Sequence, residues 1–306
     1  MSAAITVLRP GPSTTVQDLG RPGLARLGVP PAGALDPLAV RIANRLVGND
    51  EGAAVLECVL RGPALRFQRA AAVAVVGPRV PVTVAGAGAP VGAAVELAAG
   101  AVLDVGAVEG GLRCWIAVAG GIDVPPMLGS RSTDTLTGRG GRALAEGDRL
   151  PLGAARGAPL AGVAVDWPPV LDGEVTVRAV AGPHAEWFAE TPASRTWTVT
   201  PRSDRTGLRL SGGPLPRRHD REVASHGLVA GAVQVPGDGQ PVVLLANHQT
   251  TGGYPVPAVV CAADLPLLAQ ARPGWTVRFT TVDVATARAA WAERLHVLDA
   301  LPCLAL

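Results

Sequence analysis

The chain has 306 residues, of which 48% are hydrophobic and 3% aromatic, and its formal net charge is +2. All 27 basic residues are arginine. The absence of lysine excludes a P-loop lysine, a Schiff-base lysine and a covalently attached biotin on this chain. The basic residues are dispersed, which argues against a nucleic-acid-binding surface.

The start of the sequence lacks the basic stretch and long apolar run of a signal peptide. Residues 80–108 are apolar, but Pro81, Pro90, Glu96 and Asp104 interrupt them. Such interruptions predict short strands rather than a membrane span. We therefore expect a cytoplasmic protein.

The four cysteines, Cys58, Cys114, Cys261 and Cys303, stand far apart and form no Cys-x-x-Cys pair. This spacing argues against a zinc site or a redox motif. Each cysteine has apolar neighbours, so we predict buried free thiols in a reducing compartment.

Thirty-eight glycines and 28 prolines divide the chain into short elements. The first clear signal is a helix that begins after Asp36, which can cap it, with Pro37 at its first position. Many short strands and few helices indicate a mainly β fold, either a sandwich or a barrel. In chain order, the clearest further elements are strands at 82–84, 175–180 and 196–199, a helix over about 264–271, a strand at 275–279 and a helix over 284–298.

A stretch rich in Pro and Gly, residues 152–173, predicts the linker between two domains. Similar strand-like segments, Ile5–Val7 and Val175–Val177, open the two halves, and Gly-Pro follows each of them. This echo predicts two related domains, over residues 1–157 and 172–306, arranged in tandem or with some segments interleaved.

The densest group of polar residues is 247–254. The adjacent Gly252 and Gly253 allow the backbone to approach a ligand closely. His248 adds a titratable group, and its neighbours supply neutral donors and acceptors. The alternative interpretation is a hairpin loop that turns at the two glycines. The only tyrosine of the chain, Tyr254, lies here and favours a binding role.

Ser225 and His226 are adjacent, upstream of this group. Neighbours in a strand point to opposite faces, so they do not readily share a hydrogen bond between nucleophile and base. The chain also lacks a Gly-x-Ser-x-Gly elbow. The sequence therefore does not favour a Ser-His hydrolase.

Residues 202–210 contain three arginines within eight positions. In a strand, Arg205 and Arg209 share one face, where two guanidinium groups can converge on an anion. A surface network of ion pairs with Asp204 explains the same residues equally well. Both interpretations remain open at this point.

The run 129–134, which includes Arg131, is rich in hydroxyl groups. It has the composition of a phosphate-binding loop but also that of ordinary Asx and Ser/Thr turns, and the turn is the simpler interpretation. The histidines do not have the spacing of metal ligands. They are His184, His219, His226, His248 and His296. We predict no metal site beyond Mg²⁺ that accompanies a nucleotide.

Together these segments resemble the family of allophanate hydrolase subunit 2, also called the biotin-dependent carboxyltransferase family. It includes the C subunit of prokaryotic 5-oxoprolinase and the antagonist of a sporulation-kinase inhibitor. The most specific match is Gln-Thr-Thr-Gly-Gly-Tyr-Pro at 249–255, and the matches follow the family's order along the whole chain. The other matching segments are 15–23, 28–30, 33–36, 120–125, 129–132, 202–207 and 234–236.

Two positions depart from the family pattern. Thr206 stands where the family usually has methionine, a change that we expect to affect packing. Asn247 stands where aspartate is more usual, which argues against a carboxylate role at this position.

The resemblance implies two cyclophilin-like β-barrel domains with a few short helices. It also implies a heteromeric complex with a B-type, kinase-inhibitor-like subunit, which shares the active site, and an A-type lactam-hydrolase subunit. The implied reaction is the ATP-dependent opening of 5-oxo-L-proline to L-glutamate. The implied cofactors are ATP and Mg²⁺, and the expected role of this chain is to assist phosphoryl transfer to the lactam oxygen.

Phosphoryl transfer requires positioned charge rather than a covalent nucleophile. With this reaction in view, we assign charge stabilisation to Arg205 and Arg209 and substrate positioning to Gln249 and Tyr254. The expected substrate- or nucleotide-binding residues are Asp204, Arg131, Gln234, His248, Thr250, Thr251, Gly252 and Gly253.

Two other functions are compatible with the same resemblance. One is the carboxyltransferase half of an enzyme that carboxylates urea or a similar amide, with biotin delivered in trans. The other is a non-enzymatic antagonist that sequesters a kinase inhibitor.

Overall fold

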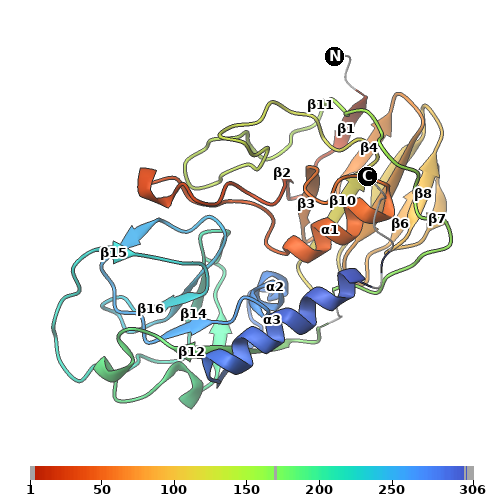
Figure 1. Ribbon diagram of the computed structural model, residues 1–306. Helices are drawn as coiled ribbons and strands as arrows, with labels where there is room; N and C mark the ends of the chain where they lie inside the picture. Colours follow the sequence, from red (N-terminus) through yellow and green to blue (C-terminus); the bar gives the residue numbers. More distant parts are fainter. Residues whose placement is uncertain (1–3, 169–170, 300, 302–306) are drawn as a thin grey trace. The chain divides into compact units, whose positions relative to one another are not determined.

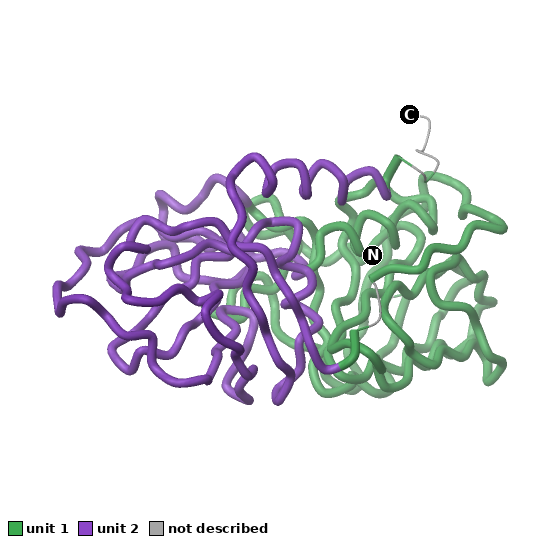
Figure 2. The backbone as a smooth tube through the Cα atoms, turned by 90° about the horizontal axis from the view of Figure 1, so that it is seen from below, with its two compact units in different colours: residues 1–21, 36–172, 298–306 green, residues 22–35, 173–297 purple. Residues whose placement is uncertain are grey.

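The computed structural model describes residues 4–168, 171–299 and 301. The chain forms two compact units, shown in different colours in Figure 2. Unit 1 consists of residues 1–21, 36–172 and 298–306, and unit 2 consists of residues 22–35 and 173–297. Residues 22–35 and 298–306 thus fall in the other unit from the one that the predicted boundaries, 1–157 and 172–306, would give them. The predicted domain boundaries themselves stay a prediction.

Unit 1 contains eleven strands and one α-helix within its described residues (Figure 1). The strands are β1 (Ile5–Arg9), β2 (Ser13–Gln17), β3 (Val55–Val59), β4 (Ala64–Phe67), β5 (Ala71–Val76), β6 (Val82–Val84), β7 (Ala87–Ala89), β8 (Ala94–Leu97), β9 (Val102–Val105), β10 (Arg113–Val118) and β11 (Arg149–Leu150), and the helix is α1 (Pro37–Leu46).

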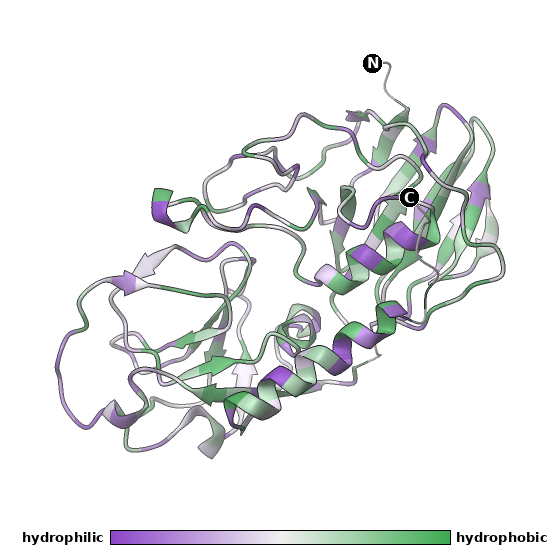
Figure 3. Ribbon diagram, viewed as in Figure 1, coloured by the Kyte–Doolittle hydropathy of each residue, from purple (hydrophilic) through white to green (hydrophobic). Residues whose placement is uncertain are grey.

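The strands of unit 1 form two antiparallel sheets, in the orders β11-β1-β4-β9-β6-β7 and β2-β3-β10-β5-β8. The core includes inward-facing residues from both sheets, for example Leu65 and Leu103 from the first and Leu56 and Ile116 from the second. Strand β10 is buried along its whole length because its other face packs against α1. In Figure 3 the strands of this unit are mostly coloured as hydrophobic.

Helix α1 begins where the sequence predicts it. The Asp36 carboxylate accepts hydrogen bonds from the N–H groups of Leu38, at 3.0 Å, and Ala39, at 3.1 Å. This cap satisfies two of the amides that a helix start leaves without partners. Leu38, Ile42 and Leu46 are buried, so the predicted apolar face is confirmed.

Unit 2 contains the remaining elements. They are the 3-10 helices η1 (Ala25–Leu27), η2 (Ala185–Trp187) and η3 (Pro192–Ser194), the helices α2 (Leu265–Gln270) and α3 (Val284–Asp299), and the strands β12 (Glu174–Ala181), β13 (Trp197–Val199), β14 (Gly207–Ser211), β15 (His226–Gly227), β16 (Ala232–Gln234), β17 (Val242–Leu244), β18 (Thr251–Gly252), β19 (Ala258–Val260) and β20 (Thr276–Thr281).

Seven strands of unit 2 form a closed barrel, in the order β12-β19-β16-β17-β14-β13-β20. The pairing of β12 with β20 is parallel and closes the barrel. Strands β15 and β18 form a separate two-stranded ribbon. The mainly β fold class with few helices is therefore confirmed, with a closed barrel in unit 2 and two sheets in unit 1.

The segment 22–35 is distant in sequence from the rest of unit 2 but bonds to it. The N–H of Ala32 donates to the carbonyl of Ala246 at 3.0 Å. This bond places the early segment beside the loop that follows β17.

Three of the four cysteines, Cys58, Cys114 and Cys261, are buried free thiols, as predicted, and Cys303 lies outside the described residues. Burial and the neighbouring Cys114 raise the pKa of Cys58, and burial raises the pKa of Cys261. No helix in the described part of the chain is long and apolar enough to cross a membrane.

Candidate functional site

Three neighbouring barrel strands of unit 2 bring most of the predicted site residues together. Arg205 precedes β14, residues 247–249 follow β17, and Gln234 ends β16. Because β14 and β17 are antiparallel, the start of one lies beside the end of the other. Accordingly, the N–H of Asn247 donates to the carbonyl of Arg205 at 3.0 Å.

The Arg205 side chain is buried beside Asn247. Its Nε donates to Oδ1 of Asn247 at 2.9 Å, and Nη2 donates to the carbonyl of Gly33. Arg205 is 7% exposed and Asn247 is fully buried. A neutral amide oxygen thus accepts a hydrogen bond from a buried cation.

The structure does not place Arg205 and Arg209 on one strand face, which is the basis of one of the two interpretations left open by the sequence. Strand β14 begins only at Gly207, so the strand alternation does not extend back to Arg205. Arg209 lies on the exposed face of the strand between the buried Leu208 and Leu210. Its proposed part in charge stabilisation stays a prediction.

Asp204 stabilises the turn before β14. Its Oδ1 accepts hydrogen bonds from the N–H groups of Thr206, at 2.7 Å, and Gly207, at 3.1 Å. This is the Asx arrangement that short acidic side chains adopt at turns. The structure therefore gives this carboxylate a turn-forming role; its predicted ligand-binding role stays untested.

A pair of glutamines forms the second polar cluster. Nε2 of Gln249 donates to Oε1 of Gln234 at 3.0 Å. Gln234 is 3% exposed, and its own Nε2 has no hydrogen-bond partner within the described residues. A Cβ atom added to Gly252 would lie 2.8 Å from that Nε2, so any side chain at position 252 would collide with the Gln234 amide. A buried donor without a partner costs free energy unless a ligand or water completes it.

His248 lies between the two clusters and is 4% exposed. Burial lowers its pKa below the ordinary value, and the hydrogen bond between Nδ1 and the Gln249 carbonyl, at 2.6 Å, opposes that shift. The neutral imidazole is therefore the favoured form near pH 7.

The rest of the predicted motif forms the ribbon and turn that continue from Gln249. The Thr250 carbonyl accepts from the N–H of Leu228 at 2.9 Å, and Thr251 lies exposed in β18. Gly253 is exposed, and Tyr254 has 49% of its surface exposed. Gly252 lies within β18, which pairs with β15, so the predicted hairpin turn at the two glycines is wrong. The exposed side chains of this segment are open to a partner or ligand.

Three histidines and Trp187 form a chain of ring contacts, although the sequence gives the histidines no common spacing. The ring of His184 lies 5.0 Å from that of Trp187 and 5.4 Å from that of His226, and His219 lies 4.6 Å from Trp187. Nδ1 of His184 accepts from the N–H of Val256 at 3.2 Å. Within the described ranges, no group of three His, Cys, Asp or Glu side chains is arranged to hold a metal ion.

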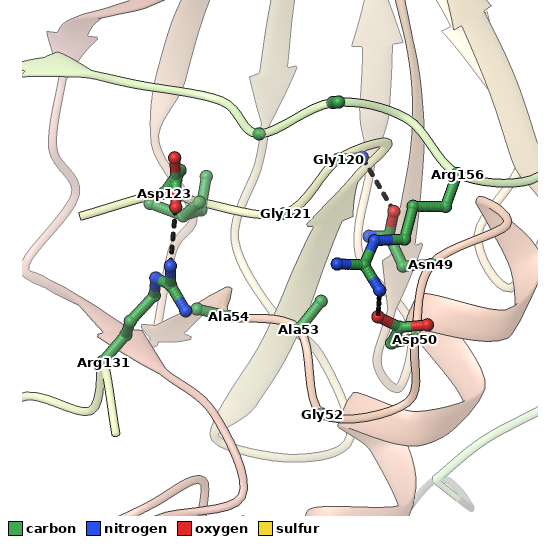
Figure 4. Close-up of a pocket in the computed structure, with 13 residues that line it drawn as sticks. Asn49, Asp50, Gly52, Ala53, Ala54, Gly120, Gly121, Asp123, Arg131 and Arg156 are labelled. Carbon is green, nitrogen blue, oxygen red and sulfur yellow. Dashed lines mark hydrogen bonds and ion pairs between the residues drawn. The ribbon is translucent and has the colours of Figure 1, made fainter. Parts of the chain in front are cut away.

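Arg131 belongs to unit 1 and makes its contacts there. Its Nη2 donates to Asp123 at 2.6 Å, and it lines a pocket of about 380 Å³ (Figure 4). The hydroxyl groups of Ser130 and Ser132 donate to the buried Asp18 carboxylate, each at 2.6 Å. These hydroxyl groups hold the loop, which agrees with the turn interpretation rather than with phosphate binding.

Sequence reasoning missed Gly33 and Asn247 as partners of Arg205. Gly33 lies in a segment that matches the family, but it is 172 residues from Arg205, and no local pattern reveals the contact. It also missed Asn49, Asp50 and Arg156 of the unit 1 pocket, which stand in unremarkable turn sequences.

Comparison with known proteins identifies the family. A family model described as the carboxyltransferase domain, subdomain A and B, matches residues 27–281. The chain is 38% identical over 304 residues to the C subunit of 5-oxoprolinase from Escherichia coli K12, a match that covers 97% of each protein. It is 37% identical over 281 residues to the C subunit of 5-oxoprolinase from Haemophilus influenzae, with 88% of each covered.

Among solved structures, the urea carboxylase of Kluyveromyces lactis superposes with a TM-score of 0.91 and 32% identity. The match covers the whole of this chain and 30% of that protein. These likenesses agree with the resemblance carried by the motifs at 202–207 and 249–255. The chain therefore belongs to the carboxyltransferase family of subdomains A and B, which includes allophanate hydrolase subunit 2 and the C subunit of 5-oxoprolinase.

Proposed function

We propose that this chain is a subunit of an ATP-dependent 5-oxoprolinase, which opens 5-oxo-L-proline to L-glutamate. The observation that carries the proposal is the sequence match to the C subunit of E. coli 5-oxoprolinase, which is 38% identical over 304 residues. The identity to the K. lactis urea carboxylase is lower, at 32%.

The chemistry of the unit 2 clusters supports a positioning role. Phosphoryl transfer depends on placed charge and on orientation of the reacting groups. Arg205 is a buried positive charge fixed by Asn247 and Gly33. The Nε2 donor of Gln234, which is buried beside Gly252 and has no hydrogen-bond partner among the described residues, suits the carbonyl oxygen of a small amide or lactam.

ATP and Mg²⁺ are the expected co-reactants. The described residues of this chain do not present a cluster of carboxylates for a metal ion. Mg²⁺ is commonly held by substrate phosphates together with one or two carboxylates. In this proposal the B-type subunit supplies those carboxylates, and this chain positions the amide group. The A-type lactam-hydrolase subunit then completes the hydrolysis.

The second candidate is the carboxyltransferase half of an enzyme that acts on urea or a similar amide, with biotin delivered in trans. The fold match to K. lactis urea carboxylase favours it. Carboxyl transfer to an amide nitrogen also requires a polar site that orients the amide. The same glutamine pair, Gln234 and Gln249, serves that purpose.

A panel of substrates separates them. The chain is co-expressed with the subunits of its neighbouring genes, and the purified complex is assayed for ATP hydrolysis. Stimulation by 5-oxo-L-proline, with formation of L-glutamate, is the expected result. Stimulation only by urea, bicarbonate and a biotinylated carrier protein would replace the proposal with the carboxyltransferase function.

A further inference from the structure

Unit 1 contains a pocket of about 380 Å³ that the proposed reaction does not use (Figure 4). Three backbone segments, 52–54, 120–122 and 153–154, line it. They bond to one another: the N–H of Ile122 donates to the Ala54 carbonyl at 2.9 Å, and the N–H of Gly153 donates to the Gly121 carbonyl at 3.2 Å. The pocket wall thus consists of main chain held together by backbone hydrogen bonds, rather than of side chains with a gap between them.

Glycine is required where two of these segments meet. A Cβ atom added to Gly120 would lie 2.2 Å from the Gly153 carbonyl oxygen, and one added to Gly153 would lie 2.4 Å from that of Gly120. Such distances are shorter than any real contact, so side chains are excluded from this part of the wall. This part of the wall therefore consists of main chain, whose polarity suits a polar ligand.

A buried amide network holds this wall in place. Asn49 is 3% exposed; its Oδ1 accepts from the N–H of Gly120 at 2.7 Å, and its Nδ2 donates to Oδ1 of Asn44 and to the Val118 carbonyl. Asn44, on α1, in turn donates to the carbonyls of Glu51 and Ala53. A satisfied buried network of this kind fixes geometry, so the pocket is preorganised.

Two pairs of opposite charges stand on opposite sides of the pocket, as Figure 4 shows. On one side Arg131 donates to Asp123 at 2.6 Å, and on the other Arg156 donates to Asp50 at 2.6 Å. The Arg156–Asp50 pair is largely exposed. Exposed pairs contribute little stability, so a ligand can replace one partner at small cost.

The charge pattern selects the ligand class. A polyphosphate would meet two carboxylates beside the two arginines, which disfavours it. An apolar ligand would desolvate the two ion pairs without offering them any hydrogen bond. A small molecule with a carboxylate for an arginine and an N–H donor for an aspartate satisfies both kinds of group.

We propose that this pocket binds a small ligand that carries both a carboxylate and an N–H donor, that is, an amino acid or its lactam. The inference rests on the proposed function only in the choice of probes, 5-oxo-L-proline and L-glutamate. It also assigns Arg131 to a carboxylate-bearing ligand rather than to a nucleotide.

Calorimetric titration of the isolated full-length chain tests the proposal. Saturable binding of at least one probe at millimolar concentration is expected, with ATP and inorganic phosphate failing to compete. Arg156→Ala and Asp50→Asn are each expected to weaken the binding by about tenfold, since each removes one charge-assisted bond. Both positions are exposed, so these variants leave the fold intact.

Arg278→Ala is the matched control, because Arg278 forms a similarly exposed pair with Glu174 in unit 2. It is expected to leave the affinity unchanged. Absence of binding of both probes, equal affinity in wild type and the two pocket variants, or displacement by ATP would each overturn the proposal. The assay needs neither partner subunits nor ATP turnover, so a negative result would leave the 5-oxoprolinase proposal standing. Equally, failure of the 5-oxoprolinase assay would leave the proposal for this pocket standing.

Discussion

Arg205 and Asn247 form a buried hydrogen bond of 2.9 Å, from the guanidinium Nε to the amide Oδ1, on adjacent strand ends of the unit 2 barrel. The bond links a cation to a neutral acceptor. Gln249, two residues after Asn247, donates a hydrogen bond to the side-chain oxygen of Gln234. The loop after β17 therefore belongs to both polar clusters.

Replacement of Asn247 tests this bond. Asn247→Ala removes the acceptor of a buried charged donor and is expected to lower the free energy of unfolding by about 2 kcal/mol. Asn247→Asp restores an acceptor of the same size and is expected to be less destabilising than alanine at neutral pH. Urea unfolding followed by tryptophan fluorescence measures both, and an alanine variant as stable as wild type would contradict the role of the bond.

Two histidines are expected to titrate below their ordinary range. Burial lowers the pKa of His248, and burial followed by the nearby His226 lowers the pKa of His184, with Glu186 opposing. In an NMR titration both should protonate below about 6.5, the ordinary histidine value.

The sign of the stability effect follows from these shifts. The unfolded chain binds protons more readily than the folded chain, so the contribution of both groups is full above the unfolded pKa. It is lost as pH falls through the folded pKa. The double variant His184→Gln, His248→Gln should therefore lose less stability than wild type as pH falls below about 6.5. Parallel stability curves for the two proteins would contradict this.

Gly120 is expected to be intolerant of a side chain. Gly120 and Gly162 both have positive φ, at 92° and 71°, so alanine strains the backbone at either position. Only at Gly120 would the new Cβ meet another atom, the Gly153 oxygen at 2.2 Å, whereas nothing lies within 4 Å at Gly162. Thermal unfolding should show Gly120→Ala less stable than Gly162→Ala by about 2 kcal/mol. Equal losses of stability in the two variants would show that the main chain around the unit 1 pocket can shift to accommodate a side chain at position 120.

The cap of α1 is expected to contribute to the stability of unit 1. Asp36 is fully buried, bonds two helix amides and accepts a third hydrogen bond from the Trp167 indole at 3.0 Å. Asp36→Ala should cost about 2 kcal/mol, measured by chemical unfolding. Asp36→Asn keeps an oxygen acceptor and should cost less, so equal losses for the two variants would argue against a capping role.

Local signals predicted local structure well. The Asp36-Pro37 pair located α1 because capping depends on residues within one turn of each other. The expected apolar face of that helix is the buried one. The β class followed from the frequency of Gly and Pro and from the Val- and Thr-rich pieces between them.

Long-range contacts were beyond the same reasoning. Arg205 lies two residues before β14, so a small error in the strand start changed the expected partner of its side chain. Its actual partners include the Gly33 carbonyl, which only the folded chain brings near. The unit 1 pocket likewise combines segments whose individual sequences resemble ordinary turns.

ATP hydrolysis that depends on 5-oxo-L-proline tests the proposed subunit role most directly. The complex of this chain with its B-type and A-type subunits is predicted to hydrolyse ATP and form L-glutamate, and omission of this chain should abolish both. Arg205→Ala, assembled into the complex, should lower turnover by about a hundredfold, as loss of a placed charge does. Full 5-oxoproline-dependent turnover with Arg205→Ala, or without this chain, would contradict the account.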